Sequence, residues 1–214
     1  MDLAELSVQS FVETVASDAP APGGGSVAAL EASIGAALTG MVACLTQGRK
    51  KYADCAENAA LVQSQAEDLQ KQLLKLMNKD SEAFNRVSAA FSLPKETEEE
   101  KASRSAAIQE GLKGCTQTPL EMMRLSEEAI ALAFDFLEKG FNRSSASDLG
   151  VAFLSLKSAV QGAWLNVLIN LSSIKDPDFV REYREKGEAV LNRSLPLADA
   201  GYAKVLAIVQ PQQE

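Results

Sequence analysis

Apolar residues recur at steps of three and four along most of the chain, which is the spacing of helices that bury one face. No segment of useful length alternates apolar and polar residues as a strand would. The pattern predicts helices over residues 7–17, 27–46, 54–92, 98–113, 119–139 and 149–174, then a last helical region from Asp176 that Gly187, Pro196 and Gly201 interrupt. The sequence therefore predicts an all-α protein, a single-domain bundle of long antiparallel helices over residues 1–214.

Hydroxyl side chains mark the expected helix starts. Ser7, Ser26 and Ser147 are placed to cap the helices that follow them. Thr97 and Thr118 each stand three residues before a glutamate, and this capping-box spacing predicts two separate helices between residues 97 and 139.

The stretch PAPGGGSVAAL, residues 20–30, is the first candidate for a functional site. It contains Pro22, Gly23, Gly24, Gly25 and Ser26 at the expected start of a helix. Glycines adopt positive φ easily and let another backbone or a ligand approach closely. A bare helix start carries partial positive charge and free N–H groups. The stretch therefore suits a carboxylate, a phosphate or the edge of a heterocycle, and the alternative is a plain connection between helices.

Two of the expected helices have an unusual composition. Residues 27–46 carry Ala or Gly at every fourth position, which lets a second helix approach closely, and residues 149–174 are apolar on every side. The latter helix is expected at the centre of the bundle or in a subunit interface. Asn166 and Asn170, one turn apart on it, need partners if buried, and each other, a neighbouring subunit or a substrate would all serve. Residues 32–48 are uncharged but short and rich in small side chains, so no membrane span is expected.

The composition narrows the classes of partner and chemistry. A net charge of −8 argues against nucleic acid and anionic membranes as partners. The chain has no histidine, so acid–base chemistry falls to a carboxylate, lysine, tyrosine or thiol with a shifted pKa. Its three cysteines, Cys44, Cys55 and Cys115, are widely spaced, which predicts neither disulfides nor a metal site. With no signal-peptide pattern at the N-terminus, a cytoplasmic protein is expected.

Asp80 is the candidate catalytic residue. It is four residues from both Leu76 and Phe84, so on a helix it should point inward with the apolar stripe. That stripe runs through Val62, Leu69, Leu73, Leu76, Phe84, Val87 and Phe91. Partial burial would raise the pKa of the carboxyl and suit it to general acid or base catalysis. The alternative is an aspartate at the edge of the core that pairs with a lysine or arginine.

Five segments, taken in order, closely resemble the cyclodeaminase/cyclohydrolase family: PAPGGGSVAAL, GRKKYA, DSEAFNRVSAAFSLPKETEEEKASR, NRSSASDLGVA and NVLINL. The resemblance covers residues 7–174. It implies an all-helical bundle that forms a homodimer or a higher homo-oligomer. It also implies a tetrahydrofolate substrate, possibly polyglutamylated, that carries a one-carbon unit at N5 or between N5 and N10. By the same resemblance Asp80, which opens the D-x-D/E-A-F motif, is the proton donor.

The resemblance leaves two activities open. The leading hypothesis is formiminotetrahydrofolate cyclodeaminase, which converts 5-formiminotetrahydrofolate to 5,10-methenyltetrahydrofolate and ammonia. The second is methenyltetrahydrofolate cyclohydrolase, which hydrates the methenyl bridge to 10-formyltetrahydrofolate. Neither reaction requires a metal or a redox cofactor. A rival from another class is a non-catalytic folate-binding or helical assembly protein.

Further substrate-binding residues are expected outside the glycine stretch. Arg49 and Lys51 either meet the anionic glutamate tail of a folate or form a solvated cluster that complements a helix dipole. Tyr52 either stacks on the pterin or packs. Ser147 and Asp148 are helix-capping residues first, and Asp148 is also placed to accept hydrogen bonds from pterin N–H groups.

Overall fold

The computed structural model describes residues 2–210, and within them every regular element is a helix. Six α-helices follow one another along the chain: α1 (Val8–Val15), α2 (Gly24–Gln47), α3 (Ala56–Phe91), α4 (Glu98–Lys139), α5 (Ala146–Leu171) and α6 (Pro177–Val209). Short 3-10 helices lie at η1 (Leu3–Glu5), η2 (Lys50–Cys55) and η3 (Arg143–Ser145). The all-α fold expected from the sequence is confirmed.

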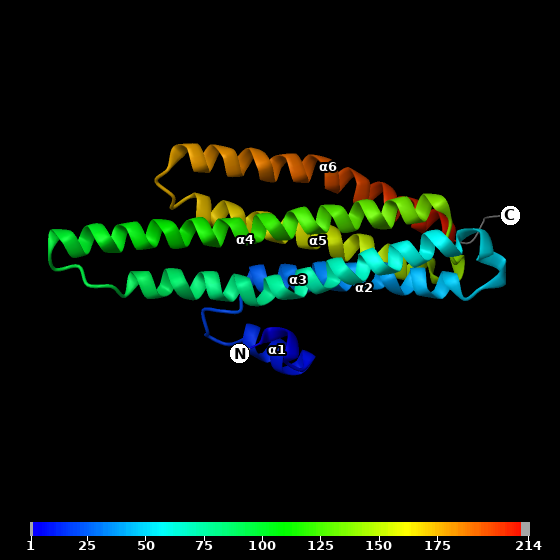
Figure 1. Ribbon diagram of the computed structural model, residues 1–214, viewed down its shortest axis with the longest axis horizontal. Coiled ribbons are helices and arrows are strands. Elements are labelled where there is room, and N and C mark those ends of the chain that lie inside the picture. The colour runs from blue at the N-terminus through cyan, green and yellow to red at the C-terminus, as the bar shows by residue number, and fades with distance from the viewer. Residues whose placement is uncertain (1, 211–214) are drawn as a thin grey trace.

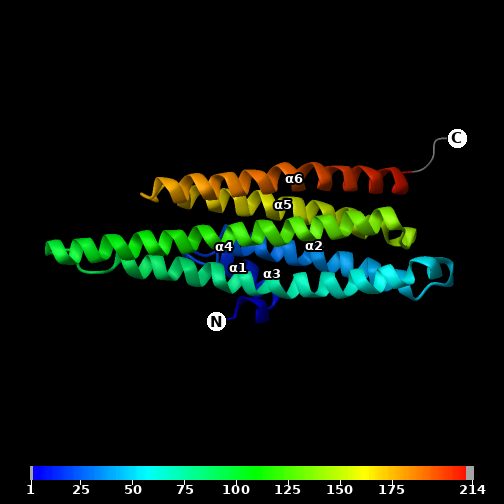
Figure 2. The same ribbon diagram turned by 45° about the horizontal axis from the view of Figure 1, so that its top comes forward.

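The long helices lie side by side as a bundle (Figure 1). Helix α2 packs against α3 and α5, α4 packs against α3 and α5, and α6 lies against α5 and α4. Helix α1 packs on the outside of α2 and α3, where its Phe11 is buried, and the turned view in Figure 2 shows α6 on the opposite side of the bundle. Four helices therefore enclose one core, and α6 covers one of its outer faces.

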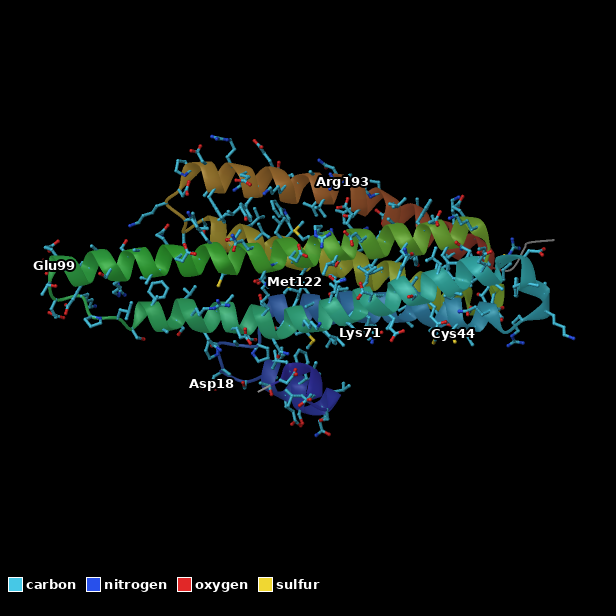
Figure 3. All side chains as sticks on the ribbon, viewed as in Figure 1. Asp18, Cys44, Lys71, Glu99, Met122 and Arg193 are labelled. Atoms are coloured by element: carbon cyan, nitrogen blue, oxygen red, sulfur yellow. The ribbon has the colours of Figure 1, made fainter. Side chains whose placement is uncertain are left out.

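The core consists of aliphatic side chains, small residues and a few aromatics. Met122 on α4 is fully buried and points into the space between the helices, whereas Lys71 and Arg193 point outward (Figure 3). Alanines fill much of the α2 contact surface, and a Cβ added at Gly35 would overlap the side chain of Leu156 on α5. The small residues of α2 thus allow the close helix approach that the sequence predicted.

One long helix, α4, replaces the two helices expected between residues 97 and 139. The Thr97 capping box is present, but Thr118 lies inside α4, where its hydroxyl donates to Gly114 O at 3.2 Å. Pro119 is also inside the helix and has no N–H to donate to the carbonyl of Cys115, one turn earlier. Asn170 Nδ2 on α5 donates to that carbonyl at 3.0 Å instead. Tertiary contact supplies the missing bond, so the helix continues.

The last helix, α6, is also continuous from Pro177 to Val209, and the expected interruptions are wrong. A Cβ at Gly187 would overlap the ring of Trp164, and a Cβ at Gly201 would overlap the ring of Phe153. Both rings belong to α5. These glycines therefore mark places where α6 passes close over aromatic side chains, rather than breaks in the helix.

Three expected helix starts can be compared with the structure. Ser7 caps α1 as predicted, its hydroxyl accepting from Ser10 N. Helix α2 begins at Gly24 rather than Val27, so Ser26 is not its cap, and its hydroxyl faces α3. Helix α5 begins at Ala146, which places Ser147 in its first turn rather than at its cap, while Asp148 lies in the first turn as expected.

Most of the apolar stripe of α3 is buried, but its last part is not. Phe84 and Phe91 expose 40% and 54% of their surface, contrary to prediction. Helix α2 runs antiparallel to α3 and begins at Gly24, opposite Asp80, so α2 does not cover the rest of α3. Figure 1 shows the α3–α4 hairpin extending beyond the start of α2.

Helices α2 and α5 are the two described segments long and apolar enough, by length and composition alone, to cross a membrane. Both carry exposed apolar side chains on the outer side of the bundle, namely Ile34, Met41, Leu45, Val151, Leu154, Leu165 and Ile169. A shallow groove runs between the two helices, with Val27 on one wall and Leu154 and Leu165 on the other. We call this surface the α2–α5 face.

Candidate functional site

The carboxylate of Asp80 lies against the first turn of α2. Ser26 Oγ is 3.1 Å from Asp80 Oδ2, 3.1 Å from Met77 O and 3.2 Å from Ser81 Oγ. The Ser26 backbone N–H also donates to the Asp80 carboxylate. Within residues 2–210 no lysine or arginine forms an ion pair with Asp80. The carboxylate is thus held by a helix N-terminus, and the ion-pair alternative is wrong.

The environment of Asp80 favours its protonated form. Burial raises the pKa of the Asp80 carboxyl above its ordinary value, and the hydrogen bonds from the Ser26 hydroxyl and N–H lower that pKa in part. The net direction is upward. A carboxyl that keeps its proton to higher pH can act as a proton donor closer to neutral conditions.

The three consecutive glycines have different surroundings. A Cβ at Gly25 would overlap the Asp80 carboxylate, with Asp80 Cγ only 2.6 Å away. A Cβ at Gly24 would meet Asn166 Nδ2 at 3.5 Å, and one at Gly23 would meet nothing within 4 Å. None of the three has a positive φ, which among the described residues occurs only at Gly140. Gly25 therefore lets Asp80 approach the helix start, and Gly23 and Gly24 leave that start uncovered.

Two asparagines of α5 border the same helix start. Asn166 Nδ2 donates to Gly162 O at 2.9 Å, and Asn170 Nδ2 donates to Asn166 O at 2.7 Å as well as to Cys115 O. The partners left open by the sequence are thus backbone carbonyls. Because each amide nitrogen is engaged, each side-chain oxygen has a fixed direction.

Cys115 completes the site from α4. Burial, followed by the nearby charge of Asp80, raises the pKa of its thiol to about 11, and Arg86 lowers it slightly. The thiol therefore stays protonated near neutral pH and is not a nucleophile there. Helices α2, α3, α4 and α5 each contribute one wall around Asp80, and we call this arrangement the Asp80 site.

The other predicted site residues lie at the far end of the bundle. Arg49, Lys51 and Tyr52 follow the end of α2, and Ser147 and Asp148 stand at the start of α5. Tyr52 Oη accepts a hydrogen bond from Arg143 N at 3.2 Å, and Lys51 Nζ lies 5.7 Å from the Tyr52 ring centre. Since α2 has 24 residues, about 36 Å of helix separates this end from the glycines. One chain does not bring the two groups together.

Sequence reasoning missed a groove of about 750 Å³ between α3, α4 and α6. Five cationic side chains line it, namely Lys79, Arg86, Arg124, Lys186 and Arg193. Arg124 pairs with Glu121 and Glu128, and Arg193 pairs with Glu127. Asp80 is not among the lining residues, but Lys79 and Gly114, the sequence neighbours of Asp80 and Cys115, are.

Comparison with known proteins places the chain in a family. A family model described as formiminotransferase-cyclodeaminase matches residues 7–189. The chain belongs to the formiminotransferase-cyclodeaminase family. The crystal structure of formiminotetrahydrofolate cyclodeaminase from Thermotoga maritima superposes with a TM-score of 0.81 at 27% identity and covers 96% of each chain.

Relatives in this family have two different activity names. A methenyltetrahydrofolate cyclohydrolase of Methylorubrum extorquens is 40% identical over 93% of this chain and 95% of its own length. A formimidoyltransferase-cyclodeaminase of Rattus norvegicus is 34% identical over 99% of this chain but only 38% of its own length. The chain is therefore similar to a whole cyclohydrolase and to one part of a two-activity protein.

The contact between Cys115 and Asn170 was not predicted, although the sequence holds a signal for it. A proline within a helix frees the carbonyl four residues earlier, and Pro119 stands four residues after Cys115. A buried free carbonyl needs a donor from another element. The two asparagines of an otherwise apolar helix were the available donors.

Proposed function

We propose that this family member is a formiminotetrahydrofolate cyclodeaminase and that Asp80 is its proton donor. The observation that carries the proposal is the Asp80 carboxyl, whose pKa burial raises, held beside the open first turn of α2. The start of α2 is bare beside it, because Gly23 and Gly24 carry no side chain. The names of the relatives support folate one-carbon chemistry.

The proposed reaction balances with one acid. N10 of the folate attacks the N5-formimino carbon and forms the N10–C bond. The bond from that carbon to the terminal nitrogen then breaks. The formimino group reacts in its protonated form, so its terminal nitrogen already carries two hydrogens; Asp80 gives it a third, the nitrogen leaves as ammonia, and the proton that N10 loses restores the carboxyl. The carbon keeps its oxidation level, so the reaction calls for no metal or redox cofactor.

The second candidate is methenyltetrahydrofolate cyclohydrolase. The similarity along nearly the whole of the Methylorubrum protein favours it. Water would add to the methenyl carbon, the bond from that carbon to N5 would break, and Asp80 would move the protons. Both reactions take place at the same carbon, so the same residues would serve either one.

Two substrates separate these activities in one experiment. Purified protein is mixed with 5-formiminotetrahydrofolate or with 5,10-methenyltetrahydrofolate, and the methenyl absorbance is followed. We expect that absorbance to appear from the formimino compound, with ammonia released in equal amount. Loss of methenyl absorbance faster than in buffer, with no reaction of the formimino compound, would assign the cyclohydrolase. No reaction with either substrate would leave a non-catalytic binding protein.

A homodimer would unite the two separated groups of residues. The α2–α5 face is apolar, and α2 and α5 run along it from the Asp80 site to the far end. If two copies pack this face antiparallel, the start of α2 in one copy lies beside the end of α2 in the other. The glycines and Asp80 would then meet Arg49, Lys51, Tyr52, Ser147 and Asp148 of the second copy. Those residues would bind the pterin and the glutamate tail, polyglutamylated or not.

This arrangement predicts that a charge on the α2–α5 face abolishes both dimer and activity. We expect Leu154→Lys to elute as a monomer in size-exclusion chromatography with light scattering, with its helical circular dichroism retained. Val209→Lys on α6 is the matched control, since Val209 is exposed to a similar degree, and it should stay dimeric. A monomeric Leu154→Lys protein with full turnover would contradict the shared site.

The cellular setting follows from the same proposal. The substrate is a small folate, and neither nucleic acid nor a membrane is needed as a partner. The similarity to the bacterial cyclohydrolase supports a cytoplasmic location.

A further inference from the structure

The side-chain oxygens of Asn166 and Asn170 have no partner among the described residues, although both amide nitrogens donate hydrogen bonds to carbonyls. Within the same residues the only fully buried side-chain polar atom without a partner is Asn58 Nδ2. Both oxygens are therefore unpaired but not fully buried. Hydrogen-bond acceptors held in a fixed direction beside Asp80 are suited to a ligand that presents N–H groups.

Asn166 and Asp80 contact neighbouring residues at the start of α2. Asn166 lies against Gly24 and Asp80 lies against Gly25, which are neighbours in the first turn of α2. Asn170 donates a hydrogen bond to the carbonyl of Cys115, and the charge of Asp80 raises the pKa of the Cys115 thiol. The two asparagines, Cys115 and Asp80 are therefore grouped around the start of α2.

The spacing of the pair matches one kind of donor. Side chains four residues apart on a helix have Cβ atoms roughly 5–6 Å apart. Two acceptors that each bind one hydrogen of the same NH₂ group, at hydrogen-bond distances of about 2.9 Å, stand about 5 Å from each other. The two amide oxygens can thus hold the two hydrogens of one nitrogen.

We propose that Asn166 and Asn170 bind the terminal nitrogen of the formimino group and make the site selective for a one-carbon unit that ends in N–H. This inference rests on the proposed function. The two oxygens hold the two hydrogens of the protonated formimino nitrogen, and once N10 has added to the carbon they keep the lone pair that appears on this nitrogen turned toward Asp80. A one-carbon unit that ends in a carbonyl oxygen has no hydrogens to offer and leaves both acceptors unpaired, which weakens its binding.

The test compares two ligands that differ at that atom: 5-formiminotetrahydrofolate, which ends in N–H, and 5-formyltetrahydrofolate, which ends in C=O. Dissociation constants are measured by calorimetry on full-length protein carrying Asp80→Asn, which slows turnover. We expect this protein to prefer the formimino ligand. Added Asn166→Leu should reduce the preference by about threefold to tenfold, the range for one hydrogen bond.

Controls separate this effect from a structural one. Asn192→Leu makes the same change on the exposed side of α6 and should leave the preference intact. Asn166→Ala serves as the second variant if the leucine lowers the melting temperature. An equal loss of affinity for both ligands would overturn the inference, because the oxygens would then bind a part common to both. An unchanged preference would also overturn it, and failure to bind either folate would overturn the proposed function as well.

Discussion

Replacing Asp80 by asparagine is expected to reduce turnover of the preferred folate by roughly 10²- to 10⁴-fold, the usual contribution of a positioned general acid. Asparagine has nearly the same shape and can still accept the hydrogen bonds from Ser26, but it has no proton to give. Steady-state assay of wild type and Asp80→Asn measures the change. Folate affinity should stay close to that of the wild type, because the lost step is proton transfer and not binding.

The same variant should not be less stable at neutral pH. Burial raises the pKa of Asp80 in the folded protein, so its contribution to stability is present at low pH and is lost as the pH rises through the folded pKa. Asp80→Asn carries no charge and escapes this loss. We therefore expect its melting temperature at pH 7 to equal or exceed that of the wild type.

An exposed aspartate of the same helix provides the control. Asp68 also lies on α3, and its carboxylate bonds only Gln72 among the described residues. Asp68→Asn should keep full turnover. A similar loss in both variants, or full activity in Asp80→Asn, would show that Asp80 is not the proton donor.

Gly25→Ala is expected to lower both stability and activity. The added Cβ would overlap the Asp80 carboxylate, so either α2 or Asp80 must shift. Overpacking of this kind typically costs about 1–3 kcal/mol of unfolding free energy. A displaced Asp80 also loses its hydrogen bonds with Ser26, and we expect turnover to fall by more than about tenfold, given how strongly catalysis depends on position.

Gly114→Ala is the matched change for this comparison. A Cβ at Gly114, within α4, would meet nothing within 4 Å. Alanine is favoured over glycine inside a helix by about 0.5–1 kcal/mol, so this variant should be slightly more stable than the wild type. Chemical denaturation measures both free energies, and equal stability of Gly25→Ala and the wild type would contradict the close approach of Asp80.

The sequence predicted the fold class and the positions of most helices, because apolar spacing and capping residues act locally. The predictions failed where a residue far away in the sequence determines whether a helix continues or a side chain is buried. Helix α4 continues through Pro119 because Asn170 donates a hydrogen bond to the carbonyl that the proline leaves free. Helix α6 continues through Gly187 and Gly201 because these glycines pack against aromatic rings of α5. Phe84 is exposed because α2 begins opposite Asp80. Such contacts depend on tertiary placement, which the periodicity of a single helix does not contain.

The candidate site was predictable in part. The spacing of apolar residues placed Asp80 on the inward face of its helix. The glycine stretch indicated the start of α2, which is where the Asp80 carboxylate lies. Nothing in the sequence indicated that Ser26 would form a hydrogen bond with Asp80 instead of capping its own helix. The sequence also could not show that Tyr52 and Asp148 lie at the opposite end of the bundle from Asp80. Their separation depends on α2 being one unbroken helix, which the structure shows.

The pH dependence of kcat/KM for wild type and Ser26→Ala tests the central claim most directly, that a proton held by Asp80 drives the reaction. An acid catalyst is active while protonated, so the rate should fall as the pH rises through the pKa of Asp80. The Ser26 hydroxyl lowers that pKa, and its removal should therefore raise the pKa and move the fall in rate to higher pH. A profile that stays unchanged in Ser26→Ala would contradict the assignment of Asp80 as the proton donor.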